Sequence, residues 1–220
     1  MNLNNKAVAN TINKLKAKFE REEFVIVRGQ KTVELLNWTG TFNTVGNGFI
    51  TLPGFSTSEK YVNAELAWYD SASAKADFIS NFAQLWGDIS DDRNFVNSNY
   101  GQLIYSPQNC YQFDNVVKAL KGDQQSRRAV MVYCPPHIHY TGGNDYVCTM
   151  YTSYTIRDNE LNAFVSMRSC DLRFGLVGAD LAWQIHVLKE LADKLGVKPN
   201  RVHWHAVSLH LYERHFEALK

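Results

Sequence analysis

The side chains best suited to chemistry in this chain lie in its last third. Cys148 and Arg168 stand on the two arms of a hairpin that the residue pattern predicts. His210 and Tyr212 stand two residues apart on a predicted final strand, so both point to the same side of it. A thiol, a guanidinium and two hydrogen-bonding side chains are therefore expected to face one pocket. This combination indicates a nucleotide site with a covalent nucleophile.

The elements that must position these side chains are strands and helices in mixed order. The hairpin is predicted over residues 146–171, with its turn at residues 157–160, and the final strand over residues 201–212. Further strands are predicted at 24–28, 32–42 and 127–134, and helices at 4–20, 59–70, 74–87, 111–123 and 178–196. The polar stretch 88–109 is expected to be a loop. The predicted fold class is α+β, and since no repeat or linker divides the chain, residues 1–220 are expected to form a single domain.

Composition excludes several classes of function. The formal net charge of +1 gives no field that would attract nucleic acid or a membrane surface, so an anionic ligand must be small and held by local arginines. No apolar run approaches the ~18 residues of a membrane span, and the polar start does not resemble a secretory signal. The four cysteines form no CxxC pair, which favours free thiols in a reducing compartment. A cytoplasmic protein is expected.

Two histidine pairs have a spacing that could serve metal binding. His137 and His139, and His203 and His205, have the i, i+2 spacing with which a strand can present two zinc ligands. No third ligand of fitting context accompanies either pair, so no metal is expected.

Glu65 and two adjacent arginines complete the candidates. Glu65 lies three residues after Val62, close to the buried stripe of its predicted helix, so its carboxylate is expected to have a partner or a function. Arg127 and Arg128 open an apolar strand, and the alternation of side chains prevents both from lying on one face of one sheet. They could still reach one anion at the mouth of the strand or across a subunit boundary.

These motifs, taken in order, resemble those of thymidylate synthase and its pyrimidine hydroxymethylase relatives. The motifs are Glu65-Leu66-Ala67-Trp68, Trp86, Tyr100-Gly101, Ser126-Arg127-Arg128, Arg168-Ser169-Cys170-Asp171 with Gly175-Leu176, and His210-Leu211-Tyr212 with His215. Cys148 lies twenty residues before Arg168, where the family has its nucleophile. The resemblance covers residues 60–216 and is weak before them. It implies a mixed β-sheet flanked by helices, and a homodimer formed through that sheet.

The resemblance implies a role for each catalytic residue. Cys148 is expected to add to carbon 6 of a pyrimidine deoxynucleoside monophosphate, while Glu65 organises water and moves protons at the base. Asp171 is expected to act in catalysis and to face the pterin of the co-substrate, 5,10-methylenetetrahydrofolate. Trp86 is expected to form a stacking wall for that folate.

The remaining implied roles concern the sugar phosphate. His210 and Tyr212 are expected to hydrogen-bond the sugar 3′-hydroxyl. Five side chains are expected to hold the phosphate: Arg28, Arg168 and Ser169 from one subunit, and Arg127 and Arg128 from the second, so that the homodimer shares its active sites.

Several departures from the family pattern bear on the reaction. Thr149 stands where synthases have the His after the nucleophile, and Ser153 stands where they have a Gln. The sequence ends at Lys220, without the C-terminal tail that synthases fold over the folate.

The departure at Asp180 bears on the base. Synthases have an Asn there, and an Asp at this position makes the chain resemble phage deoxycytidylate hydroxymethylases. An amide can match the N3 donor and O4 acceptor of uracil, whereas a carboxylate can accept from both donors of N3-protonated cytosine. Asp180 also stands where the N-cap of the last helix belongs. The two roles are compatible.

Three functions stay open on the sequence. The first is hydroxymethylation of dCMP, which Asp180 favours. The second is a thymidylate synthase or hydroxymethylase acting on dUMP. The third is a non-catalytic nucleotide-binding relative, which Thr149 and Ser153 suggest.

Overall fold

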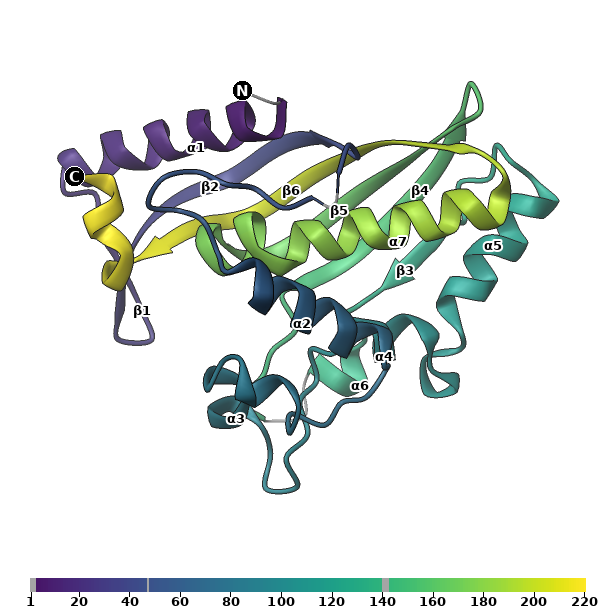
Figure 1. The fold of residues 1–220 in the computed structure, drawn as a ribbon, viewed down its shortest axis with the longest axis horizontal. Helices are drawn as coiled ribbons and strands as arrows, with labels where there is room; N and C mark the ends of the chain where they lie inside the picture. The colour runs from purple at the N-terminus through teal and green to yellow at the C-terminus, as the bar shows by residue number, and fades with distance from the viewer. Residues whose placement is uncertain (1–2, 47, 140–142) are drawn as a thin grey trace.

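The computed structural model describes residues 3–46, 48–139 and 143–220. Its centre is a six-stranded sheet in the order β1-β2-β6-β5-β4-β3, in which only the β5–β6 pair is parallel (Figure 1). The strands are β1 (Val25–Val27), β2 (Gln30–Asn43), β3 (Val130–Val132), β4 (Thr149–Arg157), β5 (Glu160–Asp171) and β6 (Lys198–Tyr212). The predicted mixed sheet flanked by helices is confirmed.

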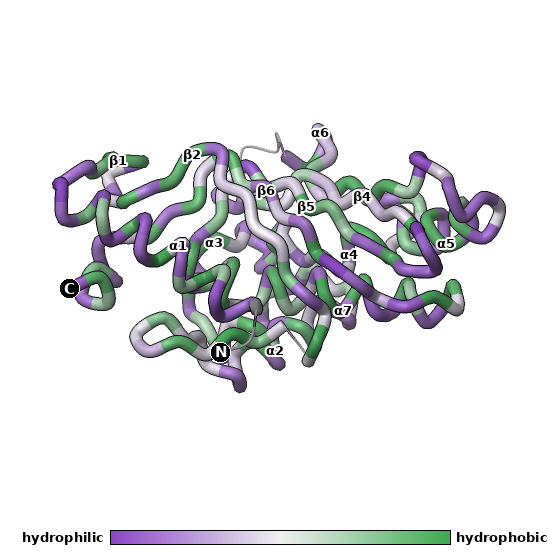
Figure 2. Tube along the Cα trace, turned by 90° about the horizontal axis from the view of Figure 1, so that it is seen from above, coloured by the Kyte–Doolittle hydropathy of each residue, from purple (hydrophilic) through white to green (hydrophobic). Residues whose placement is uncertain are grey.

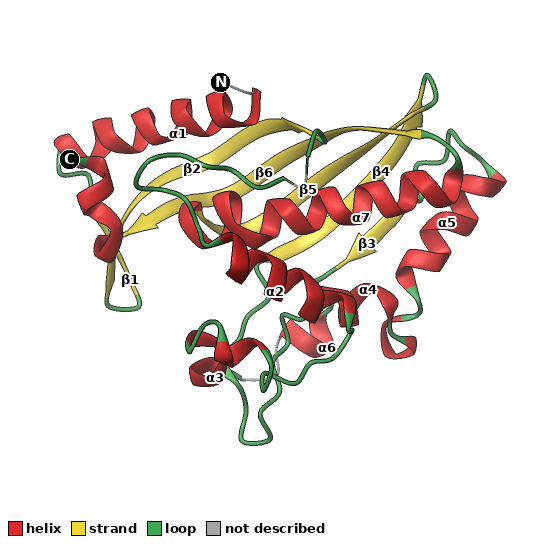
Figure 3. Cartoon of the chain, viewed as in Figure 1, coloured by secondary structure: helices red, strands yellow, loops and turns green. Residues whose placement is uncertain are grey.

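Seven α-helices and four segments of 3₁₀- or π-helix, the shorter of which have three residues each, accompany the sheet within the described residues (Figure 3). The α-helices are α1 (Leu3–Glu20), α2 (Glu59–Asp70), α3 (Leu85–Ile89), α4 (Tyr100–Tyr105), α5 (Gln112–Gly122), α6 (Pro136–His139) and α7 (Asp180–Leu195). The 3₁₀- and π-helical segments are η1 (Ile79–Asn81), η2 (Pro107–Asn109), η3 (Leu172–Ala179) and η4 (Glu213–Leu219). Figure 2 shows the strands along one side of the molecule and α1, α2 and α7 along the other. The long helices therefore cover one face of the sheet.

The hairpin forms where its turn residues predict it. Asp158 and Asn159 both adopt left-handed backbone conformations, with φ of 52° and 62°, as a two-residue hairpin turn requires. The arms then pair in register from Arg157–Glu160 to Thr149–Met167, with one irregularity between Thr149 and Tyr151. This pairing brings the beginning of β4 beside the end of β5.

The last helix and strand close the core. α7 buries Leu181, Ile185 and Leu188, as its periodicity predicts, and ends at Gly196, whose φ is 67°. β6 then runs parallel to β5, so Asp171 and His210 are direct neighbours at the ends of the two strands.

The outer face of the sheet is uncovered in the single chain. Several large apolar side chains on its strands are exposed, among them Val130, Val132, Tyr151, Phe164 and Val207. On the same strands the ring of His203 stacks on Phe164, with centroids 4.7 Å apart. In the described part of the chain no helix is long and apolar enough to cross a membrane, and all four cysteines are unpaired.

The prediction of one helix over residues 74–87 is wrong. The backbone of Ala76 donates to the carbonyl of Asn94 at 2.9 Å, and Lys75 pairs with Phe95 in an isolated bridge. The indole nitrogen of Trp68 also donates to the carbonyl of Lys75, at 2.9 Å. These long-range bonds occupy backbone groups that a helix would use, so only η1 and α3 form.

The predicted loop over residues 88–109 contains helix α4. Asn99 caps its first turn by accepting from the backbone of Gln102 at 2.7 Å. Its amide nitrogen also donates to the carbonyl of Trp68 at 2.8 Å, which anchors α4 to α2. Because the position of Asn99 depends on this contact with a distant residue, the local sequence indicates the start of α4 only weakly.

Gly101 allows α4 to approach α2 closely. A Cβ at Gly101 would lie 1.6 Å from the carbonyl oxygen of Tyr69, so Gly101→Ala must separate the two helices. We expect this substitution to lower the free energy of unfolding by more than about 3 kcal/mol, measured by urea denaturation. Gly122→Ala is the control, because nothing lies within 4 Å of its Cβ, and it should change stability by less than about 1 kcal/mol. Equal stability of the two variants would contradict this account of Gly101.

Candidate active site

A pocket of about 520 Å³ opens between α2, α3, the ends of β4 and β5, and the start of α7. Six of the predicted site residues line it: Glu65, Trp86, Cys148, Ser169, Asp171 and Asp180. Side chains that the sequence reasoning missed also line it, among them Tyr61, Tyr69, Asp145, Phe174 and Arg214.

The thiol and the guanidinium that the sequence singled out are in contact. Nη2 of Arg168 lies 3.8 Å from Sγ of Cys148, and the backbone of Arg168 donates to the carbonyl of Cys148 at 3.0 Å. The guanidinium also donates to the carbonyls of Val147 (2.9 Å) and Tyr146 (2.6 Å). Arg168 therefore fixes the segment that carries Cys148 as well as placing a positive charge beside the sulfur.

The surroundings of Cys148 favour the neutral thiol over the thiolate. Burial raises the pKa of Cys148 to about 12 despite the opposing charge of Arg168. Asp180, Asp145 and Asp171 raise it further by like-charge repulsion. A nucleophilic role thus requires that the thiol proton be lost when a ligand binds.

Two carboxyl groups share the pocket, that of Glu65 buried and that of Asp180 half-buried. Glu65 is 4% exposed and accepts a 2.6 Å hydrogen bond from Tyr69, while its Oε2 has no partner of hydrogen-bonding geometry among the described residues. Burial raises the pKa of Glu65 to about 7 and that of Asp180 to about 8, and the charge of Glu65 contributes to the shift of Asp180. The pair therefore retains a proton near neutral pH, which suits proton transfer.

The N-cap role predicted for Asp180 is wrong. Ala179 is the N-cap of α7, and Asp180 lies inside the first turn. The reason is η3, which runs directly into α7 and leaves no capping position at residue 180. Its carboxyl faces the pocket instead, against Gly175, where a Cβ would lie 2.6 Å from Oδ2 of Asp180.

Three tyrosines surround the two carboxyl groups. Tyr61 and Tyr69 flank Glu65 at i−4 and i+4 on α2, so the helical period could have identified them. Tyr61 accepts a hydrogen bond from the indole of Trp86 at 3.1 Å. Tyr100 accepts from the Thr149 hydroxyl at 3.0 Å and interacts with Asp180, whose pKa it lowers.

Asp171 stands at the opposite wall, where β5 ends. It accepts backbone hydrogen bonds from Arg173 (2.7 Å) and Phe174 (3.0 Å), which start η3. His210 and Tyr212 lie beside it on β6, with their rings 5.0 Å apart, and burial lowers the pKa of His210. These neighbours lie next to the pocket without lining it.

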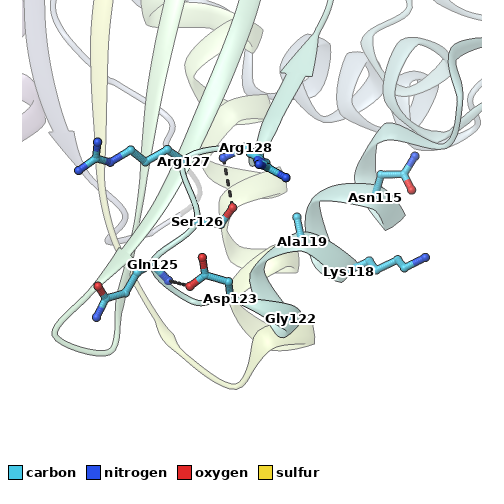
Figure 4. A pocket seen from close by; sticks show the side chains of 9 residues that line it. All are labelled: Asn115, Lys118, Ala119, Gly122, Asp123, Gln125, Ser126, Arg127 and Arg128. Carbon is cyan, nitrogen blue, oxygen red and sulfur yellow. Dashed lines mark hydrogen bonds between the residues drawn. The ribbon is translucent and has the colours of Figure 1, made fainter.

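Three predicted arginines do not reach this pocket within one chain. Arg28 lies in the β1–β2 turn with φ of 47°. Arg127 and Arg128 line a separate surface hollow beside α5, and Figure 4 shows their side chains pointing to opposite sides of the backbone. The residues described form no group of three or more side chains that could hold a metal ion.

Comparison with known proteins identifies the family. The family model described as thymidylate synthase matches residues 7–220. The chain belongs to the thymidylate synthase family. The sequence resemblance is thereby confirmed.

Phage enzymes are among the relatives of this family member. The deoxycytidylate 5-hydroxymethyltransferase of Enterobacteria phage T4 is 32% identical over 213 residues, which are 90% of this chain and 82% of the phage protein. The deoxyuridylate hydroxymethyltransferase of Bacillus phage SP01 is 28% identical, over 73% of this chain and 45% of the relative. A thymidylate synthase of Fusobacterium nucleatum is 30% identical, over 49% of this chain and 38% of the relative.

The protonation state of Cys148 can be measured by alkylation. Because its pKa is about 12, the rate of reaction with iodoacetamide should rise about tenfold per pH unit from pH 7 to pH 10. Mass spectrometry of the Cys148 peptide gives the rate, in a Cys110→Ser background because Cys110 is exposed. A plateau below pH 9 would show that the free protein already holds a thiolate.

Proposed function

We propose that this protein makes 5-hydroxymethyl-dCMP from dCMP and 5,10-methylenetetrahydrofolate. Its family and its phage relatives support the broader activity, transfer of a one-carbon unit to carbon 5 of a pyrimidine nucleotide. The observation that carries the choice of cytosine is the half-buried carboxyl of Asp180, which lines the pocket together with Glu65. The whole chain, residues 1–220, is then one catalytic domain.

The protonation of the carboxyl pair suits cytosine. Asp180 and Glu65 hold a proton between them near neutral pH, and Asp180 can pass it to N3 of the base. The Asp180 carboxylate that results accepts hydrogen bonds from N3–H and from the 4-amino group of the base. These two bonds stabilise its negative charge, which the bound base shields from water. Protonation of N3 also withdraws electrons from carbon 6, so the ring becomes a better acceptor for sulfur.

Cys148 is then the nucleophile. Its thiol proton passes to the Glu65 carboxylate as the sulfur forms a bond to carbon 6 and the double-bond electrons move to carbon 5. Carbon 5 then attacks the methylene that folate supplies, which breaks the bond from that methylene to one folate nitrogen, and this nitrogen takes up the proton. Carbon 5 loses its proton, tetrahydrofolate leaves, water adds to the exocyclic methylene and the thiolate departs. Glu65 is suited to accept the proton of that water, because its pKa is near neutral and Oε2 is available.

The far wall of the pocket fits a flat aromatic co-substrate. Trp86 and Phe174 line it, with Leu85 and Ile89 beside them. Asp171 reaches the same space from the end of β5, so it can meet polar edges of a pterin. These residues support the folate assignment, with Trp86 as a stacking surface and Asp171 as its polar contact.

The sugar phosphate is assigned to the end of the sheet. Arg168 and Ser169, with Arg28, would hold the phosphate, and His210 and Tyr212 would hydrogen-bond the 3′-hydroxyl. Arg127 and Arg128 line a hollow separate from the pocket of their own chain, which supports a role in the site of a second copy. The exposed apolar outer face of the sheet is the surface we assign to that homodimer.

One alternative keeps the chemistry and changes the base. The SP01 relative, named for deoxyuridylate, supports a hydroxymethylase acting on dUMP. A non-catalytic relative is disfavoured by the contact between Arg168 and the Cys148 sulfur, which a pure binding protein would not need.

Base specificity is tested by tritium release from carbon 5 of dCMP and dUMP in the presence of methylenetetrahydrofolate. The wild type should release tritium from dCMP without oxidation of folate, and Cys148→Ala should bind dCMP but release none. Asp180→Asn should raise the ratio of kcat/KM for dUMP over dCMP by about tenfold or more, because the amide matches uracil. An unchanged ratio would contradict base recognition by Asp180, and dihydrofolate formation would identify a synthase.

Shared active sites are tested by mixing inactive subunits. Random pairing of Cys148→Ala with Arg127→Ala chains should restore about a quarter of wild-type activity, because half of the dimers carry one intact site of two. Mixing Cys148→Ala with Glu65→Gln chains is the control. Each of these residues lines the pocket of its own chain, so every site in a mixed dimer keeps one substitution and no activity should be restored. Absence of recovery in the first mixture would contradict a site built from two chains.

A further inference from the structure

The nucleophile lies outside regular secondary structure. β4 begins at Thr149, and residues 143–148 belong to no helix or strand. One backbone bond reaches Cys148, from the nitrogen of Arg168 to its carbonyl at 3.0 Å. Side-chain contacts must restrain the rest of the segment, and the Arg168 guanidinium supplies those to the carbonyls of Tyr146 and Val147.

Asp145 restrains the segment from the other side. Its Oδ2 accepts from the backbone nitrogen of Ser98 at 2.7 Å, and its Oδ1 accepts from the Ser98 hydroxyl at 2.6 Å. Asp145 is 8% exposed and Ser98 is 7% exposed, so water competes little for either bond. Both carboxylate oxygens are engaged by one residue, which fixes the orientation of the carboxylate as well as its position.

Two further bonds continue this connection along the chain. The side-chain amide of Asn97 donates to the backbone carbonyl of Asp145 at 2.9 Å. Beyond the cysteine, the Thr149 hydroxyl donates to Tyr100 at 3.0 Å. Residues 97–100 thus run beside residues 145–149 and bond to them before and after Cys148.

The segment that makes these bonds is itself held firmly. Asn99 caps α4 and donates to the carbonyl of Trp68 on α2. The rings of Tyr100 and Tyr69 stack with centroids 5.0 Å apart. Since α2 also carries Glu65, residues 97–100 connect the nucleophile to the helix that bears the buried carboxyl.

We propose that Ser98 and Asp145 are positioning residues that hold Cys148 at the base-binding wall of the pocket. The inference rests on the proposed role of Cys148 as nucleophile and deepens it. Asp145 acts through the segment and not on the substrate, because both of its oxygens already accept from Ser98. Neither residue belongs to the motifs that carried the family resemblance.

This role has a consequence that a purely structural one lacks. The Asp145 carboxylate lies close enough to Cys148 to disfavour the thiolate. Its neutralisation should therefore make the sulfur more reactive toward a small reagent. Loss of the Ser98 bonds should at the same time make the sulfur less well aligned with carbon 6. Reactivity and turnover should move in opposite directions.

The experiment measures both quantities in Asp145→Asn and Ser98→Ala. In Asp145→Asn the iodoacetamide rate at Cys148 should rise about threefold or more at pH 8, while kcat for dCMP falls about tenfold or more and the dCMP dissociation constant stays within threefold. Ser98→Ala keeps the backbone bond and the charge, so kcat should fall less and alkylation should change little. Ser98→Thr, which retains the hydroxyl, should recover most of the lost kcat.

Ser106→Ala provides the matched control. Ser106 is a similarly buried serine, 8% exposed, at the other end of α4, where it accepts from the side chain of Asn109. It should lower the melting temperature without changing kcat or alkylation. If Asp145→Asn does not fold, the comparison of Ser98→Ala, Ser98→Thr and Ser106→Ala decides the question.

Two results would overturn the proposal. One is a kcat within twofold of wild type in both Asp145→Asn and Ser98→Ala. The other is a parallel fall of kcat, alkylation and melting temperature, which would mark a stability effect. A wild type that turns over neither dCMP nor dUMP would refute the proposed function instead. The alkylation and melting measurements would still report whether Asp145 restrains Cys148.

Discussion

The site depends on the contact between Arg168 and residues 146–148, the irregular segment that directly precedes β4. One guanidinium bonds the carbonyls of Tyr146 and Val147 and touches the Cys148 sulfur. Its planar fork of donors can satisfy several acceptors at fixed angles, which a lysine ammonium cannot do. The hairpin register makes this possible, because it brings the first residues of β4 beside the last residues of β5.

Around that guanidinium the pocket concentrates groups that resist ionisation. Cys148, Glu65 and Asp180 all have pKa values raised by burial, and the two carboxyl groups repel each other. Such an arrangement is unfavourable for the empty protein, since each charge would lack solvent. The same arrangement favours proton transfer once a ligand with protonatable atoms binds. A proton can then pass between the ligand and a neutral side chain without leaving an unpaired charge in the pocket. In the proposed reaction the instability of the charged forms is thus part of the chemistry.

Prediction of the elements succeeded where local residues suffice. The β4–β5 turn formed at Asp158 and Asn159 because both tolerate a left-handed backbone, and α7 ended at Gly196 for the same reason. The stretch between α2 and α5 was predicted wrongly in two places. There the backbone of Ala76 bonds to Asn94 and the side chain of Asn99 bonds to Trp68, and such partners distant along the chain leave no periodic pattern to recognise.

The sequence by itself determined the family of this protein and predicted its candidate reacting groups, the thiol at Cys148, the guanidinium at Arg168 and the acid at Asp180, because such groups are residue types at characteristic spacings. It could not determine which side chains would surround them. Tyr69 reaches Glu65 within one helix, and the helical period contained that contact. Asp145 and Ser98 are hydrogen-bonded although 47 residues separate them in the sequence. Asp180 does not cap α7, because η3 runs directly into that helix. Only the tertiary structure decided these, since burial and hydrogen-bond partners are properties of the folded chain and not of any local segment.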